Sequence, residues 1–159
     1  MIEVKQATLS GDLARPKRRP AVATGKTTFQ FARNLTPLQT HDLVTEGLPV
    51  IAARELMASF RFIDRRTVLS AVGISERTLQ RGNAPGKLLD SNASDRTLRL
   101  ASVAGQAIDV LGSQEAAERW LSTPAMDLDR RRPIDLLQST EGTALVRTLL
   151  MRMDHGVYV

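Results

Sequence analysis

The sequence predicts an all-α protein, and three observations lead to this fold class. Hydrophobic residues make up 42% of the 159 residues but aromatic residues only 4%, so Leu, Val, Ile and Ala must fill the core, as they do where helices pack on helices. From Thr36 onward, apolar residues recur three and four positions apart, which is the helical period. Residues that cap helices precede these segments, and glycine or proline follows them.

The charge of the chain is distributed unevenly. Basic side chains outnumber acidic ones by seven to four in residues 1–50 and by nine to five in residues 51–100, whereas residues 101–159 hold six basic and eight acidic ones. This asymmetry suits an anionic partner at one end and a different partner at the other. Ordinary solvating charge is the alternative that composition leaves open.

Several classes of protein are disfavoured by what the sequence lacks. There is no cysteine, which excludes a disulfide scaffold, a thiolate metal site and a cysteine nucleophile. No apolar run approaches the ~18 residues that span a bilayer, and the polar N-terminal residues do not resemble a secretory signal. We therefore expect a soluble, cytoplasmic protein that does not associate with a membrane.

No constellation of catalytic or ligand-binding residues stands out. His41 and His155 have no third metal ligand at a suitable spacing, and no Ser, His and Asp order or pair of carboxylates suggests catalysis. The segment ATGKT at 23–27 is similar to the end of a phosphate-binding loop, but position 20 is proline where that motif needs glycine. We expect no metal, no cofactor and no enzymatic activity.

Residues 1–35 are predicted to form a basic, flexible arm. Residues 15–20 hold four basic side chains and two prolines, and such a segment can lie along phosphates or in a minor groove, or can simply be a solvated leader. The alternation of Thr27, Phe29 and Phe31 with other residues predicts a short strand within this arm.

Two helices are predicted next. Thr36 can cap the first and Pro37 suits its first turn, so we expect a helix over 38–46 that ends at Gly47. A second helix is expected over 50–59. Its buried side is predicted to carry Ile51, Leu56 and Phe60.

Residues 64–81 (DRRTVLSAVGISERTLQR) predict two short helices separated by a tight turn. Asp64 caps the first, Gly73 supplies the positive φ that the turn needs, and Ser75 caps the second. This is the pattern of a DNA-reading helix-turn-helix, although a plain helix pair has the same spacing. The residues that would contact DNA are Ser75, Glu76, Arg77, Thr78, Gln80 and Arg81.

The remaining third is predicted to be helical. A long helix is expected from Asp95 to Leu111, and a short one capped by Ser113 should end near Pro124. Thr140 is expected to cap the final helix. The apolar face of that helix is predicted to carry Ala144, Leu145, Leu149 and Met153.

The segment DRRTVLSAVGISERTLQRG resembles the Xre/Cro-type helix-turn-helix, and the chain from Gly47 onward is similar to antitoxins of the Xre/MbcA/ParS family. The blocks WLSTP (120–124), RRPIDLL (131–137), TEG (140–142) and the final DHGVYV resemble the toxin-binding domain of that family and follow its order. The resemblance covers roughly residues 45–159. It implies an Xre/Cro-like helix-turn-helix lobe followed by a small helical toxin-binding lobe with a C-terminal tail.

The resemblance also implies a function. The chain would be the antitoxin of a RES-Xre type II toxin-antitoxin system: it would block the active site of a RES-domain, NAD-degrading toxin with its C-terminal region and repress its own operon. Residues 36–100 would form the DNA-binding and dimerisation domain, and residues 101–159 the toxin-binding domain. The expected partners are the RES-domain toxin and operator DNA, with the chain a homodimer inside a larger complex. Carried onto this sequence, the toxin-binding residues are Arg132, Met153, His155, Gly156, Val157, Tyr158 and Val159.

The chemistry of the tail agrees with insertion into a partner. Gly156 allows the chain to turn after the helix, Val157 and Val159 offer small apolar contacts, and Tyr158 adds a hydroxyl to a large apolar ring. The alternative is a tail that covers the protein's own core. At the level of the whole chain, a freestanding helix-turn-helix regulator whose C-terminal domain only oligomerises, or a protein adaptor, remain the competing interpretations.

Overall fold

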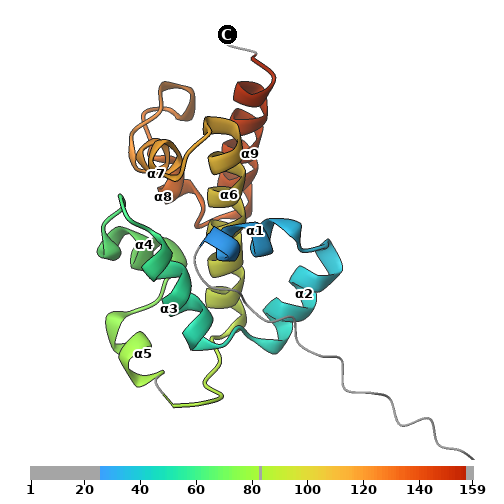
Figure 1. The fold of residues 1–159 in the computed structure, drawn as a ribbon, viewed down its shortest axis with the longest axis vertical. Helices are drawn as coiled ribbons and strands as arrows, with labels where there is room; N and C mark the ends of the chain where they lie inside the picture. Colours follow the sequence, from blue (N-terminus) through green and yellow to red (C-terminus); the bar gives the residue numbers. More distant parts are fainter. Residues whose placement is uncertain (1–25, 83, 157–159) are drawn as a thin grey trace, which may run out of the picture.

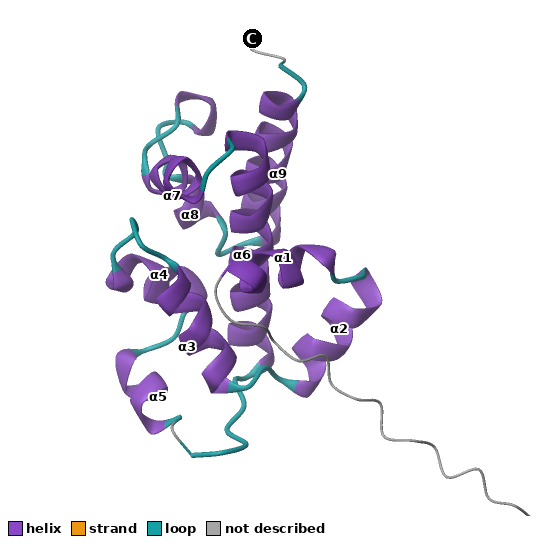
Figure 2. Cartoon of the chain, in the orientation of Figure 1, coloured by secondary structure: helices purple, strands orange, loops and turns teal. Residues whose placement is uncertain are grey.

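The computed structural model describes residues 26–82 and 84–156, so most of the predicted basic arm and the last three residues of the tail lie outside the described residues. Every regular element within these ranges is a helix, which confirms the all-α prediction (Figure 2). In chain order they are α1 (Lys26–Asn34), α2 (Pro37–Glu46), α3 (Val50–Ser59), α4 (Arg65–Val72), α5 (Glu76–Arg81), α6 (Ser91–Leu111), α7 (Gln114–Ser122), the short 3₁₀ helix η1 (Met126–Leu128), α8 (Pro133–Leu136) and α9 (Thr140–Asp154).

The strand predicted at residues 27–31 is wrong, because this segment belongs to α1. Its buried side chains are Phe29 and Ala32, three positions apart, as on one face of a helix. Phe29 packs edge-on against Phe60 with ring centroids 5.1 Å apart. The helix lies against α6 at Gly105, where an added Cβ would come 2.8 Å from the carbonyl oxygen of Phe29. A helix can approach this closely only because Gly105 has no side chain.

Helix α6 is the axis of the molecule, and α1, α2, α4, α7 and α9 all pack against it (Figure 1). It begins at Ser91 rather than at the predicted Asp95, because the carboxylate of Asp90 accepts a hydrogen bond of 2.8 Å from the Ala93 amide and caps the helix there. The polar residues 91–94 therefore belong to the first turn of the helix. Ser94 is buried, and its hydroxyl accepts a 2.9 Å hydrogen bond from the backbone N–H of Leu48.

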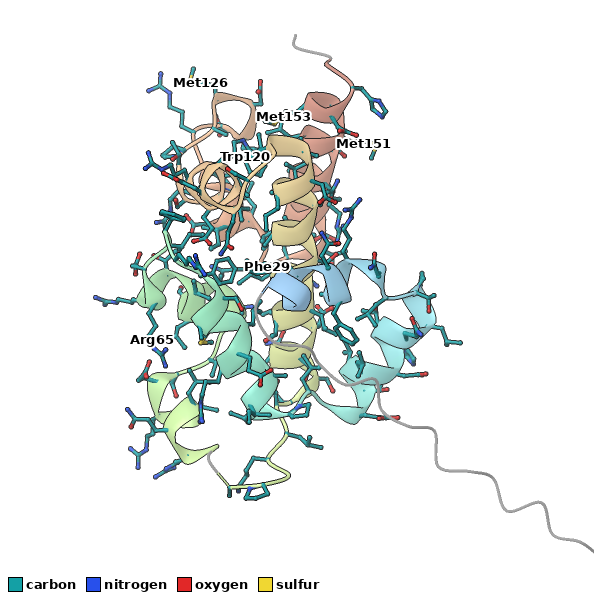
Figure 3. The ribbon with its side chains drawn as sticks, in the orientation of Figure 1. Phe29, Arg65, Trp120, Met126, Met151 and Met153 are labelled. Atoms are coloured by element: carbon teal, nitrogen blue, oxygen red, sulfur yellow. The ribbon has the colours of Figure 1, made fainter. Side chains whose placement is uncertain are left out.

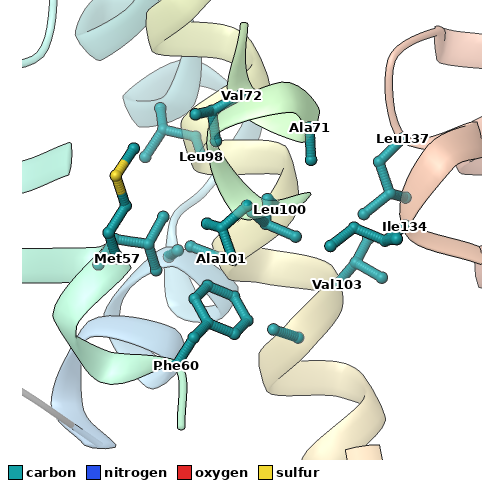
Figure 4. Packing of buried hydrophobic residues seen from close by; sticks show 14 of the residues in the cluster. Met57, Phe60, Ala71, Val72, Leu98, Leu100, Ala101, Val103, Ile134 and Leu137 are labelled. Carbon is teal, nitrogen blue, oxygen red and sulfur yellow. The ribbon is translucent and has the colours of Figure 1, made fainter. Parts of the chain in front are cut away.

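One continuous hydrophobic core joins the two predicted domains. In Figure 4, Leu100 and Val103 of α6 lie between Val72 of α4 and the pair Ile134 and Leu137. The predicted boundary between residues 100 and 101 therefore falls inside an unbroken helix. No helix in the described ranges combines the length and apolar character needed to cross a membrane.

Three positions predicted on buried helix faces are exposed to solvent instead. The side chains of Ile51 in α3 and Leu145 in α9 are each 58% exposed, and Ala144 in α9 is exposed as well. Each lies one position away from a residue that the core buries, and one position along a helix is a rotation of about 100°. The start of α9 also differs slightly: Ser139 caps it by accepting a 3.0 Å hydrogen bond from Gly142, and Thr140 is the first helical residue.

Candidate functional site

The helix-turn-helix is built by three local devices that the sequence predicted. The carboxylate of Asp64 caps α4 by accepting a 2.9 Å hydrogen bond from the Thr67 amide, and hydrogen bonds from Thr67 lower the pKa of Asp64 below its ordinary value. Gly73 ends α4 in the left-handed region, with φ at 70°. The hydroxyl of Ser75 caps α5 by accepting a 3.1 Å hydrogen bond from the Thr78 amide.

The structure divides the six predicted DNA-contacting residues into two groups. Ser75 and Thr78 are engaged in the cap, and their hydroxyl oxygens lie 2.9 Å apart. Glu76 accepts two hydrogen bonds, of 2.9 and 3.0 Å, from the guanidinium of Arg65, which lowers the pKa of the Glu76 carboxyl. The exposed side chains without a partner among the described residues are Arg77, Gln80 and Arg81.

This division changes how the surface can meet DNA. Glu76 alone would repel phosphates, but the ion pair with Arg65 neutralises it. Arg77 and Arg81 are four residues apart on α5 and therefore share a face. Their free guanidinium groups are suited to phosphate oxygens or to guanine edges. Helix α5 has only six residues, and Gly82 is its C-terminal cap.

Side chains from neighbouring helices hold α4 and α5 in place, and the sequence did not identify them. Arg54 of α3 donates a 2.6 Å hydrogen bond to the Leu79 carbonyl oxygen at the end of α5. Arg96 of α6 donates to the carbonyl oxygens of Ala71 (3.0 Å) and Ser70 (2.9 Å) at the end of α4. Both arginines therefore satisfy C-terminal carbonyl groups that a short helix leaves open.

Glu118 of α7 joins the C-terminal part of the molecule to the helix-turn-helix. The residue is 1% exposed, and its carboxylate accepts hydrogen bonds from three successive amides, those of Arg61 (3.0 Å), Phe62 (2.6 Å) and Ile63 (3.0 Å). Gln114 donates a further 2.6 Å hydrogen bond to it. The three amides directly precede Asp64, the cap of α4. A buried charge with this many donors is fully satisfied, and it fixes the loop that leads into α4.

The predicted toxin-binding residues lie partly at the C-terminal end of α9. Met153 is half-buried against the core, whereas His155 and Gly156 are exposed. The helix ends there because Gly156 takes a φ of 65° and its amide donates a 3.2 Å hydrogen bond to the Met153 carbonyl oxygen. Val157, Tyr158 and Val159 lie outside the described residues.

Arg132 is placed differently from the other predicted toxin-binding residues. It donates two hydrogen bonds, of 2.7 and 2.9 Å, to the carboxylate of Asp135, and these raise its pKa above the ordinary value. The charge of Asp64, the cap of α4, adds to this effect. Among the described residues, no hydrogen bond or ion pair joins Arg132 to Met153 or His155. In this ion pair the charge of Arg132 is balanced by an acid three positions along the chain.

Two exposed methionines, Met126 and Met151, join the predicted toxin-binding residue Met153 at this end of the molecule, and the sequence did not single out either of them. Figure 3 shows Met126, Met151 and Met153 at the same end of the molecule, with Trp120 below them. The side chains of Met126 and Met151 are 74% and 53% exposed. Flexible thioether side chains adapt to irregular apolar partners, so they are common on protein-binding surfaces. We call Met126, Met151, Met153 and His155 the methionine end.

Comparison with known proteins bears on both surfaces. Residues 39–102 match the model of the antitoxin Xre-like helix-turn-helix domain, and residues 106–156 match that of the antitoxin Xre/MbcA/ParS C-terminal toxin-binding domain. An antitoxin Xre from Yersinia enterocolitica is 34% identical over 113 residues, which cover 70% of this chain and 74% of the relative. The chain belongs to the Xre antitoxin family.

Two further relatives agree with this family. An antitoxin Xre from Pseudomonas putida is 31% identical over 122 residues, covering 74% of the chain and 72% of the relative. A protein named Prs ADP-ribosylating antitoxin, from a Sphingobium species, is 26% identical over 149 residues, covering 86% of the chain and 93% of the relative. This Xre-family antitoxin thus combines a helix-turn-helix domain with a toxin-binding domain, as its motif order predicted.

Within the described ranges, no three His, Asp or Glu side chains are grouped so as to hold a metal ion.

Proposed function

We propose that this antitoxin neutralises a RES-domain, NAD-degrading toxin by covering the toxin's active site with its C-terminal region. We further propose that it represses its own operon through α4 and α5, and that it acts in the cytoplasm without catalysis of its own. The match of residues 106–156 to a toxin-binding domain carries the proposal. The order of the blocks at 120–124, 131–137 and 140–142 supports a RES-domain toxin as the partner.

The methionine end supports an apolar contact with the toxin. Met126 and Met151 are exposed at the end of the molecule where the chain leaves α9. Burying such side chains yields about 25 cal/mol per Å² of apolar area. Gly156, with its left-handed φ, releases the chain from the helix axis. Residues 157–159 would then enter the toxin while the methionines pack around the entrance.

The test of neutralisation uses the purified toxin and the full chain. NAD consumption by the toxin is measured against increasing antitoxin, and the same titration is made with a chain lacking residues 157–159. We expect the shortened chain to bind the toxin, but we expect the bound toxin to keep most of its NAD-consuming activity. Full inhibition by the shortened chain would show that the tail does not block the active site.

A substitution on α7, Arg119→Gln, is the matched control, because Arg119 is an exposed residue held only in a surface ion pair with Glu115. It should inhibit as the unchanged chain does. If the unchanged chain and both variants bind operator DNA but fail to bind the toxin, the protein is a freestanding regulator.

Operator binding is proposed to require a homodimer. Helix-turn-helix proteins read two half-sites about one DNA turn apart, and one copy of α5 can reach only one of them. The test compares binding to an operator with binding to the same half-sites moved apart by about half a turn, roughly 5 base pairs. Equal affinity for both DNA fragments would contradict the homodimer.

A further inference from the structure

A cavity of about 450 Å³ is lined by residues of α1, α2, α6 and α9 and by none of α4 or α5. Leu35 and Leu98 contribute apolar walls, and Thr40 and Ser102 contribute hydroxyl groups. Helix α9 contributes only residues of its first half, so the cavity is separate from the methionine end. Its volume is within the range of sites that bind small molecules, about 300–1,000 Å³.

The charged groups around the cavity do not balance. Arg33 is paired with Asp109, and Arg99 is paired with Asp95. Arg147 of α9 donates hydrogen bonds to the Ser102 hydroxyl (3.0 Å) and to the Gln106 amide oxygen (3.3 Å). Both of these partners are neutral, and no carboxylate of the described residues pairs with Arg147. One guanidinium charge therefore remains uncompensated inside the cavity.

The surroundings of Arg147 make its positive charge energetically unfavourable. Burial, and then the nearby charge of Arg99, lower the pKa of Arg147 from its ordinary value. A guanidinium nevertheless stays protonated in proteins, so deprotonation does not relieve the repulsion. A bound anion would relieve it, because hydrogen bonds between guanidinium and phosphate or carboxylate groups are short, charge-assisted and directional.

We propose that this cavity binds a small anion that carries a phosphate or a carboxylate group. Arg147 contacts the anionic group together with Arg99, whose guanidinium also donates a 3.2 Å hydrogen bond to the Leu137 carbonyl oxygen. Leu35 and Leu98 face the organic remainder of the ligand. The cavity is formed by one chain and uses neither α5 nor the tail, so this proposal does not rest on the proposed function.

The test is a calorimetric titration of the full chain, without toxin or DNA, with inorganic phosphate, pyrophosphate and succinate in separate experiments. We expect saturable binding of at least one of them, and binding about tenfold weaker in Arg147→Gln, which loses the charge. The matched control is Arg66→Gln, which removes an exposed arginine of α4 outside the cavity and should bind as the unchanged chain does. Stronger binding of the phosphates would identify a phosphate-bearing ligand, and stronger binding of succinate a carboxylate.

A second variant covers the case in which Arg147→Gln does not fold. Thr40 lies at the cavity wall on α2, so Thr40→Glu places a carboxylate beside the arginines without altering them. The new carboxylate should compete with the added anion for the arginines and weaken binding of that anion by about tenfold. The proposal is overturned if Thr40→Glu binds as the unchanged chain does, if Arg66→Gln loses binding as Arg147→Gln does, or if none of the three anions saturates.

Discussion

Helix α5 of the helix-turn-helix lies toward one end of the long axis of the molecule and the methionine end toward the other, and the two offer different chemistry (Figures 1 and 3). The face of α5 presents two free guanidinium groups, from Arg77 and Arg81. The methionine end presents exposed thioether groups, from Met126 and Met151. The first surface is suited to an anionic partner, and the second to an apolar one.

This difference in surface chemistry allows one small chain to bind two different partners, each at its own surface. Attraction to phosphates is long-ranged and falls with salt, whereas apolar burial is short-ranged and nearly independent of salt. The two surfaces share α6 and one core, so they differ in surface chemistry while depending on a common scaffold. Substitutions should therefore either separate the two activities or, at the junction, remove both.

The largest effect is expected at the junction, from Glu118→Ala. Three backbone amides would lose a buried charged acceptor, so we expect the free energy of unfolding to fall by about 3 kcal/mol. Binding of DNA and of toxin should weaken together. The measurement is urea unfolding followed by circular dichroism. Glu115→Ala is the control, because Glu115 lies on the same helix in an exposed ion pair worth at most about 1 kcal/mol. An equal decrease in the free energy of unfolding in both variants would contradict the role of Glu118 at the junction.

The second effect should separate the two ends. Replacing Arg77 and Arg81 by alanine should weaken operator binding roughly 100-fold, and if both contact phosphates the salt dependence of log K should become shallower by about two. Inhibition of the toxin should not change. Fluorescence anisotropy at several salt concentrations measures both quantities. Arg119→Gln serves as the control for the loss of a surface charge. An unchanged salt slope would mean that these arginines do not contact phosphates.

The reverse separation is expected at the methionine end. Replacing Met126 and Met151 by lysine should weaken toxin binding about tenfold, because a charge would be buried in an apolar contact. Operator binding should be unchanged, and surface positions such as these alter stability by no more than about 0.5 kcal/mol. Ile51→Lys is a matched control, since Ile51 is 58% exposed but lies on α3. If the control weakens toxin binding equally, the toxin contacts a different surface.

The smallest effect concerns pH and belongs to the helix-turn-helix. The ion pair with Arg65 lowers the pKa of Glu76 below its ordinary value of 4.5. A lowered folded-state pKa stabilises the folded state above that ordinary value, and this contribution is lost as the pH falls through the folded-state pKa. A nuclear magnetic resonance titration should show the pKa of Glu76 rising toward 4.5 in Arg65→Gln but not in Arg66→Gln. No difference between the variants would contradict the ion pair in solution.

Local signals predicted much of the helix-turn-helix, since each depends on residues close together in the chain. Asp64 and Ser75 cap their helices by bonding amides three positions on, and Gly73 adopts the left-handed φ of a tight turn. The prediction failed at residues 27–31, where alternation suggested a strand. Contact with α6 and with Phe60 makes that segment a helix instead. Ile51 and Leu145 likewise face solvent because the position of neighbouring helices decides which side of α3 or α9 is buried.

The residues that connect and position the two surfaces could not be predicted from local sequence signals. Glu118 and its three amide donors are 55 to 57 residues apart in the chain, and Arg96 is 25 residues from the Ala71 carbonyl that it caps. Such pairings leave no pattern in a single sequence. The unbalanced charge of Arg147 is another example, because it depends on which carboxylates the fold places nearby.

By itself, the sequence determined the helical fold class, the caps and turn of the helix-turn-helix, and membership of the Xre antitoxin family. These follow from short-range periodicity, from bonds between residues three or four apart, and from the order of motifs. Only the tertiary structure decided that both domains share one core on α6, that Glu118 joins them, and that the methionines gather at the end of α9. These features arise because packing brings distant residues together, and burial then decides which charges need partners.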